Sequence, residues 1–315
     1  MGRVVVRRLA AGVLTLLVVS GVVFAAGLLL PGDAARAVLG RTATPERLEA
    51  LRQQMHLDDP PLGRYWSWIG DLATGNLGDS VITQQPVTQL IGERATNSVL
   101  LMVLAALVAT PLSILLGTWS ALRRDRLADH ATSLGTLVLA SLPEFVTGVV
   151  LLFLFSTVVF RWFPAVTDAT RPVLEQPAVL VLPTVTLVLA VSPYITRMMR
   201  ATMLEVLDSE YVHQARLKGV PERTVLLRHA LPNSIGPVAQ VVALQLAWLA
   251  GGIVLVETLF AYPGIGEGIF QAVDNRDIPT LQALVMLVAA FYVVVNLLAD
   301  VIGVLANPRL RAGAR

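Results

Sequence analysis

Few residues in this chain could perform covalent chemistry, and they do not cluster. The four histidines, His56, His130, His213 and His229, form neither an HExxH motif nor a pair four residues apart. A zinc or hydrolytic site on a helix needs such a pair, because both ligands must lie on one face. No GxSxG motif is present, and the absence of cysteine excludes thiolate ligands and disulfides. We therefore predict no catalytic residue and no metal site.

A nucleotide site is also missing from the sequence. The chain contains no GxxxxGK[ST] loop, whose backbone amides and lysine hold nucleotide phosphates in ATPases. The glycine-rich residues 264–268 do not follow a strand of a βαβ unit, and we interpret them as a turn into a short re-entrant segment. We expect no cofactor in this chain itself.

Two of the carboxylates within or beside long apolar stretches are candidates for function. Glu144 follows Pro143 in the stretch 131–160, where burying a carboxylate against lipid would be costly. It could line a translocation path and attract a cationic group, or it could accept hydrogen bonds from hydroxyls and from backbone groups that the proline frees. The second carboxylate is Glu257, which fits equally well as an ordinary interfacial carboxylate. The alternative is an outer gate or docking site, which we predict to consist of Glu257, Phe260, Tyr262, Pro263 and Gly264.

Long apolar segments must position these residues. Hydrophobic side chains make up 55% of the 315 residues and charged ones 15%, and the mean hydropathy of +0.68 excludes an ordinary soluble domain. A helix needs about 20 apolar residues to cross a bilayer. Six segments reach or approach that length, at about 9–30, 98–122, 131–160, 178–196, 235–258 and 281–305. The sequence predicts an all-α polytopic membrane protein with six transmembrane helices.

The basic residues predict how the spans are oriented. Six spans place both termini on one side of the membrane. Most of the 24 Lys and Arg lie in the amino terminus, the 123–126 loop, the 201–234 segment and the tail. By the positive-inside rule these parts are cytoplasmic, and the loop after the first span is outside. The net charge of +2 is small and spread over loops, so nucleic acid is not an expected partner.

The chain divides into four predicted parts: an anchor helix (1–30), an extracytoplasmic cap (31–96), a permease-like core (97–305) and a cytoplasmic tail (306–315). The anchor continues too far for a signal-peptide core, so we interpret it as uncleaved. In the cap, Thr44 and Pro45 indicate the start of a helix. Tyr65, Trp66 and Trp68 suit the membrane interface.

Residues 201–234, which we call the elbow, connect the fourth and fifth spans. They include Lys218, the only lysine of the chain. Gly219 can end a helix in the left-handed conformation, Pro221 suits the start of the next helix, and Pro232 would limit its length. The pattern predicts two helices with a glycine turn between them on the cytoplasmic face, where something could dock.

Side chains of the elbow add detail to this prediction. Leu204, Leu207 and Tyr211 recur at helical spacing, which predicts one apolar stripe before the glycine turn. We interpret His213 and His229 as polar contacts of the docking surface rather than metal ligands.

The spacing within the elbow is informative. Gly219 follows Ala215 by four residues, and the Leu231-Pro232 pair comes about a dozen residues later. This resembles the Glu-Ala-Ala loop of permease subunits in binding-protein-dependent ABC importers, with His213 and Gln214 in place of its first two residues. The wider run YVHQARLKG is similar to the variant of the dipeptide, oligopeptide and nickel importer branch.

Other stretches resemble the same branch, in the same order along the chain: LLPGD at 29–33, GNLGDS at 75–80, VETLFAYPGIG at 256–266 and NPR at 307–309. The chain is identified as a member of this family. The resemblance implies that the elbow seats on a cytoplasmic ATPase, through Tyr211, His213, Ala215, Lys218, Gly219, Leu231 and Pro232.

The resemblance also implies the partners and the substrate. They are a second homologous permease, one or two cytoplasmic ATPases that carry ATP and magnesium, and an extracytoplasmic substrate-binding protein. The chain would then be a non-enzymatic subunit in a bacterial or archaeal cell membrane, forming half of the path for di- or oligopeptides. Nickel chelates or another small solute are the alternative substrates.

Two other classes of protein remain open from the residues alone. An ATP-independent secondary transporter would be expected to show paired charges within the membrane and inverted repeats, and the sequence shows neither. A non-transporting scaffold for the binding protein is the other possibility.

Overall fold

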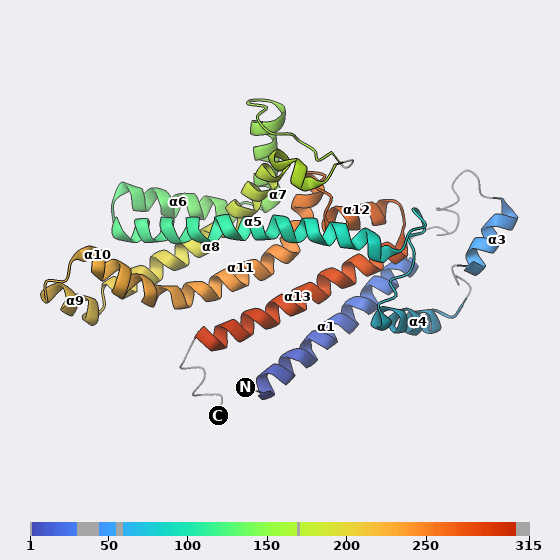
Figure 1. Ribbon diagram of the computed structural model, residues 1–315, viewed down its shortest axis with the longest axis horizontal. Coiled ribbons are helices and arrows are strands. Elements are labelled where there is room, and N and C mark those ends of the chain that lie inside the picture. Colours follow the sequence, from blue (N-terminus) through green and yellow to red (C-terminus); the bar gives the residue numbers. More distant parts are fainter. Residues whose placement is uncertain (1, 30–43, 55–58, 169–170, 307–315) are drawn as a thin grey trace. The chain divides into compact units, whose positions relative to one another are not determined.

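The structure is a computed structural model that describes residues 2–29, 44–54, 59–168 and 171–306 (Figure 1). Apart from an isolated β-bridge between Asp79 and Pro86, the regular structure of these residues is helical. The α-helices are α1 (Gly2–Leu29), α3 (Pro45–Gln54), α4 (Pro61–Thr74), α5 (Val87–Leu122), α6 (Leu127–Ser141), α7 (Glu144–Leu152), α8 (Pro177–Leu207), α9 (Glu210–Leu217), α10 (Glu222–Thr224), α11 (Leu231–Leu259), α12 (Ile265–Asp274) and α13 (Ile278–Ala306).

Several of these helices are long and apolar enough to cross a membrane. Among the described residues, four pass on their own: Val6–Leu29, Val87–Leu122, Pro177–Leu207 and Ile278–Leu297. Two bent pairs raise the number to six if each pair forms one span. One pair is α6 with α7 and its π-helical continuation, and the other is the helix that runs from the elbow through α11. The prediction of an all-α polytopic membrane protein is confirmed.

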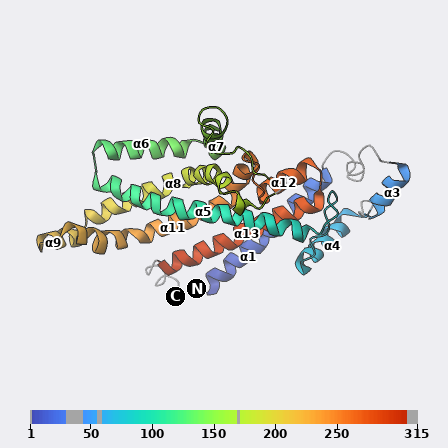
Figure 2. The same ribbon diagram turned by 45° about the horizontal axis from the view of Figure 1, so that its top comes forward.

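The chain forms two compact units. One is built mainly from residues 99–262, and the other from 6–98 and 263–293, so that α5 and α13 contribute to both. In the first unit α8 packs against α6, α7 and α11 (Figures 1 and 2). Its side chains are buried on several faces, as expected of a helix that is apolar all round. Pro183 and Pro193 lie within α8 without ending it.

The predicted span 131–160 does not form one straight helix. Leu142 is extended (φ −91°, ψ 130°), as steric contact with a following proline favours, so α6 ends at Ser141. After Pro143, α7 begins at Glu144, and the direction of the chain changes by 102°. Pro143 is therefore a break between two helices.

The GNLGDS stretch at 75–80 connects α4 to the start of α13 within the second unit. Gly75 ends α4 in the left-handed conformation (φ 82°), and Gly78 is also left-handed (φ 73°). Ser80 Oγ then donates to Oδ2 of Asp277, which also accepts from Thr280 Oγ1 at 2.8 Å. Asp277 immediately precedes α13, so the stretch secures the start of that helix.

The aromatic residues of α4 pack on α1. The ring centroids of Phe24 and Tyr65 lie 5.3 Å apart, and those of Phe24 and Trp68 lie 6.0 Å apart. The hydroxyls of Ser20 and Tyr65 are hydrogen-bonded at 2.9 Å. The predicted helix start at Pro45 is observed as α3. The motifs at 30–33 and 307–309 lie outside the described residues.

Candidate functional site

The first half of the elbow is a helix closed by a glycine turn. Ser209 is extended just before α9, Glu210 is acidic in its first turn, and Arg216 is basic in its last, which complements the helix dipole. At the other end the Gly219 amide donates to the Arg216 carbonyl at 3.0 Å, and the Val220 amide donates to that of Ala215 at 3.2 Å. This is a Schellman motif with Gly219 at φ +76°.

The second half of the elbow differs from the prediction at Pro232. Helical structure runs without a gap from Glu222 through a π-helical turn, Val225–Ala230, into α11, so Pro232 does not limit the helix. The Leu231 amide donates to the Leu226 carbonyl, five residues earlier. The wider π turn makes room for the ring of Pro232, which in an α-helix would clash with the carbonyl four residues before it.

The predicted apolar stripe is also wrong. Leu204 and Leu207 belong to α8 and pack against its buried cluster. Tyr211 belongs to α9, beyond the break at Asp208 and Ser209, where it is exposed. Its hydroxyl lies 3.4 Å from the His229 carbonyl oxygen. The stripe is interrupted because the chain turns before Glu210.

The elbow has an inward and an outward side. Val212 and Val225 are fully buried, and α9 packs against the π turn that contains Val225. Large apolar side chains point outward, at Leu217 (68% exposed) and Leu227 (53% exposed). The predicted coupling residues divide between these sides: Tyr211, His213, Lys218, Gly219 and Pro232 are exposed, and Ala215 and Leu231 are partly buried.

An ion pair spans the glycine turn. Arg216 of α9 donates to both carboxylate oxygens of Glu222, from Nη2 at 2.7 Å and from Nε at 3.1 Å. The hydrogen bond to Glu222 raises the pKa of Arg216. The pair bridges the two halves of the elbow, but both side chains are exposed, so it adds little stability.

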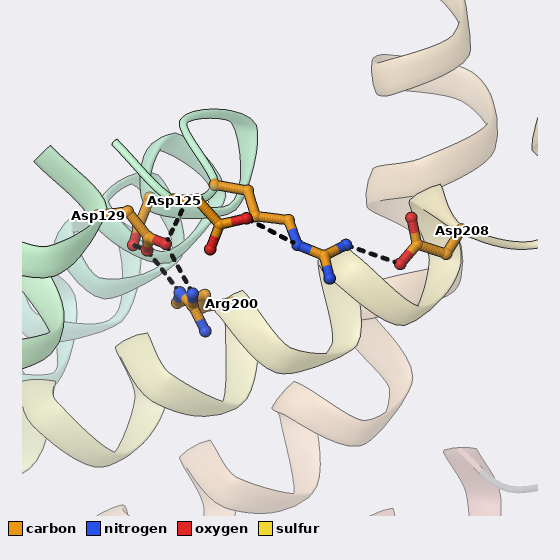
Figure 3. Close-up of polar contacts among 6 residues, drawn as sticks. Asp125, Asp129, Arg200 and Asp208 are labelled. Atoms are coloured by element: carbon orange, nitrogen blue, oxygen red, sulfur yellow. Dashed lines mark hydrogen bonds and ion pairs between the residues drawn. The ribbon is translucent and has the colours of Figure 1, made fainter. Parts of the chain in front are cut away.

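A second set of charges, which the sequence interpretation missed, lies at the base of the elbow (Figure 3). Asp129 of α6 accepts two hydrogen bonds from Arg200 of α8, from Nε at 2.6 Å and from Nη2 at 2.7 Å. Ser120 Oγ donates to the same carboxylate at 2.6 Å, and the Asp125 amide donates at 3.1 Å. The side chain of Asp129 is only 1% exposed.

The neighbouring loop makes another pair with the junction of α8 and α9. Arg124 Nη1 lies 3.0 Å from Asp208 Oδ2, and Arg124 Nε lies 3.6 Å from Asp125 Oδ2 (Figure 3). These side chains are more than half exposed. The 123–126 loop thus contacts Asp129 of α6 and Asp208, the residue that follows α8.

Glu144 lies at the first position of α7, directly after the break at Pro143, and is partly buried. Gly148, one helical turn later on the same face, is close to Thr186 of α8 and to Leu259. A Cβ on Gly148 would lie 2.6 Å from Leu259 Cδ2. The face of α7 that carries Glu144 is therefore the face directed toward α8 and α11. Its role in a path stays a prediction.

The proposed outer gate is largely inside the protein. Glu257 and Tyr262 are fully buried, and Phe260 is 3% exposed. The Tyr262 amide donates to the Glu257 carbonyl at 2.8 Å, and burial raises the pKa of the Tyr262 hydroxyl. In this conformation a docked protein could contact these side chains only after the region opens. Gating stays a prediction.

Pro263 and Gly264 belong to the second unit, where residues of α5 bind their carbonyls. Asn97 Nδ2 donates to Pro263 at 2.9 Å, and Arg94 Nη1 donates to Gly264 at 3.1 Å. Both contacts hold the start of α12, the helix that the sequence predicted as a short segment after the glycine-rich turn.

The long apolar helices, joined by the exposed elbow between α8 and α11, define the class of a multi-pass membrane protein. Residues 113–312 match the family of binding-protein-dependent transport system inner membrane components. Residues 1–102 match the amino-terminal region of such membrane components. The chain belongs to this family, whose members are permease subunits of ABC transporters and multi-pass proteins of the bacterial inner membrane.

Two relatives illustrate the similarity. The "Probable peptide ABC transporter permease protein" of Sinorhizobium fredii is 34% identical over 313 residues, covering 99% of this chain and 100% of that protein. The "Glutathione transport system permease protein" of Escherichia coli is 33% identical over 308 residues, covering 98% of each. The resemblance inferred from the sequence motifs is confirmed.

Proposed function

We propose that this chain forms half of the translocation path of an ATP-driven importer for short peptides. Family membership supports the importer, and the names of relatives that handle peptides or glutathione, itself a short peptide, support the substrate. The second half of the path would come from a homologous permease. An extracytoplasmic binding protein would deliver the peptide, and cytoplasmic ATPases would bind ATP and magnesium.

The outward face of the elbow carries this proposal. Leu217 and Leu227 expose apolar surface on the elbow, where Lys218 and Tyr211 are also exposed, whereas the inner side of the elbow is packed by Val212 and Val225. Exposed apolar side chains beside polar and charged ones are typical of a protein-docking surface. The hydrogen-bonded turn at Gly219 and the buried Val212 and Val225 make the elbow a stiff lever.

Docking on the ATPase is tested by placing a charge on the elbow. Leu217→Glu should reduce ATPase binding by about 30-fold, as expected for the loss of a central apolar contact. The matched control is Leu174→Glu, because Leu174 is 74% exposed and lies on the predicted opposite side. Binding is measured with purified ATPase and nanodisc-embedded permease. Equal binding by wild type and Leu217→Glu would remove the elbow from the interface.

Uptake measurements separate the classes of transporter. The permeases, ATPases and binding protein are reconstituted in liposomes with a labelled dipeptide. ATP-dependent uptake that requires the binding protein is the expected result. Uptake driven by an ion gradient without ATPase would identify a secondary transporter. Binding of the substrate-binding protein without any uptake would identify a scaffold.

A further inference from the structure

We propose that Asp129 is a positioning residue that joins the 123–126 loop to α8, so that the elbow moves together with the cytoplasmic ends of α5 and α6. The proposal rests on the proposed function, because it concerns how motion of the elbow reaches the membrane helices. The elbow is attached directly to α8 and α11. It has no direct chain connection to α5 or α6, so their motion must be carried by contacts.

Asp129 is the centre of such a contact. Its carboxylate accepts from the side chain of Ser120 on α5, from the backbone of the loop at Asp125, and twice from Arg200 on α8. Three separate segments therefore meet at one carboxylate with all distances at or below 3.1 Å. Bidentate pairing with a planar guanidinium also fixes the relative orientation of α6 and α8.

A second, exposed ion pair gives the loop another contact near the end of α8. Arg124 contacts Asp208, which lies eight residues after Arg200 at the junction with α9. Eight helical residues correspond to about 12 Å along α8. Two attachments that far apart resist rotation as well as translation. Asp208 is also two residues before Glu210, the first residue of α9.

Close packing supports the same rigid unit. Gly117 of α5 lies so near α8 that a Cβ there would be 2.6 Å from the Thr196 carbonyl oxygen. Ala121, Met199 and Met203 belong to one buried cluster with Ala230 of the elbow. The ion pairs and this cluster together surround the end of α8 that leads into α9.

Stability alone is a weak explanation for a buried ion pair. Well-packed apolar residues often stabilise a protein as well as the pair does, whereas removing one partner leaves a buried charge. A positioning role predicts that peptide transport, unlike stability, requires the ion pair itself. Variants that remove one charge or both charges separate these explanations.

The test compares Asp129→Asn, Arg200→Gln and the double variant in the complete, reconstituted transporter. The single variants should be less stable, and the double variant should recover stability because no lone buried charge remains. In all three, ATPase binding and ATP hydrolysis should persist, whereas peptide transported per ATP hydrolysed should fall about tenfold. Arg124→Gln, at the exposed pair, should have a smaller effect.

The double variant is decisive. If its transport per ATP returns to the wild-type value along with its stability, Asp129 is only structural and the proposal is overturned. Wild-type protein that shows no ATP-dependent uptake would instead contradict the proposed function. The two failures are therefore distinguishable.

A second measurement does not depend on altering the pair. The chain has no cysteine, so spin labels can be placed at Leu127→Cys on α6 and Gln214→Cys on α9, both exposed positions outside the predicted coupling residues. Their distance should be the same in nucleotide-free and ATP-trapped complexes, while labels on the ATPase subunits report closure. A change in the distance between α6 and α9 upon closure would overturn the proposal.

Discussion

Gly117 is a residue at which α5 packs closely on α8. An added methyl group would lie 2.6 Å from a backbone oxygen, that of Thr196, and 2.7 Å from Met199 Cβ. Neither atom is the free end of a flexible side chain, so a helix must shift. Close approach through small residues is the usual basis of helix packing in membranes.

Gly117→Ala should therefore destabilise the protein by about 1–3 kcal/mol, the typical cost of overpacking. Gly135→Ala in α6 is the matched control, because nothing lies within 4 Å of its Cβ position. That change should stabilise the helix by up to about 1 kcal/mol. Thermal unfolding in detergent measures both. Equal shifts in the two melting temperatures would show that Gly117 is not a packing contact.

Glu144 can be tested by its effect on charged substrates. If it lines the path, Glu144→Gln should reduce uptake of peptides with a free amino terminus about tenfold, which corresponds to ~1.4 kcal/mol. Uptake of the same peptides with an acetylated amino terminus should change little. Glu175→Gln, at an exposed loop position, is the control. Equal uptake of both peptide types by the variant and wild type would leave Glu144 a structural role only.

At the scale of the elements, the elbow depends on the backbone at Gly219. This residue has φ +76°, and nothing lies within 4 Å of where its Cβ would be. A substitution there would destabilise the turn only through its backbone conformation, because the added side chain meets no neighbour. Alanine should cost about 1 kcal/mol or more, asparagine less, and valine most, because the left-handed conformation tolerates these side chains in that order.

The series Gly219→Asn, Gly219→Ala and Gly219→Val should weaken ATPase binding progressively. The loss arises because a distorted turn misplaces α9 relative to the π turn at Val225–Ala230. Binding titrations with the purified ATPase give the order. Arg216→Gln, which removes only an exposed ion pair, should lie near wild type. If Gly219→Val binds the ATPase as well as wild type does, the turn can rearrange without affecting docking.

The elements also show what the sequence could and could not predict. The helices were predictable because length and hydropathy are local properties, and Gly219 was predictable because its turn needs glycine. The break at Pro143 was visible, but its 102° angle depends on packing against α8 and α11. The π turn before Pro232 depends on a hydrogen-bond register that no residue type specifies.

The pair of Asp129 with Arg200 was not predictable for a different reason. Its partners are 71 residues apart in the chain. Asp129 follows three arginines at 123–126, so it resembled one more charge in a solvated loop. Only the packing of α6 on α8 reveals that it is buried. Long-range ion pairs of this kind leave no periodic signal in a single sequence.

At the scale of the whole molecule, the orientation in the membrane is the premise of the proposed mechanism. The elbow can meet an ATPase only if it faces the cytoplasm. The positive-inside rule predicts that it does, because the amino terminus, the 123–126 loop, the elbow and the tail together hold most of the basic residues. The loop that contains Leu174 should then face the opposite side.

Single cysteines test this orientation directly, since the chain has none of its own. In intact spheroplasts a membrane-impermeant maleimide should label Leu174→Cys and Leu62→Cys, which are 74% and 76% exposed. Leu217→Cys should be labelled only after the membrane is opened, and faster when the ATPases have been removed, because a docked ATPase covers it. Labelling of Leu217→Cys in intact spheroplasts would reverse the orientation and place the elbow where no ATP-driven partner could reach it.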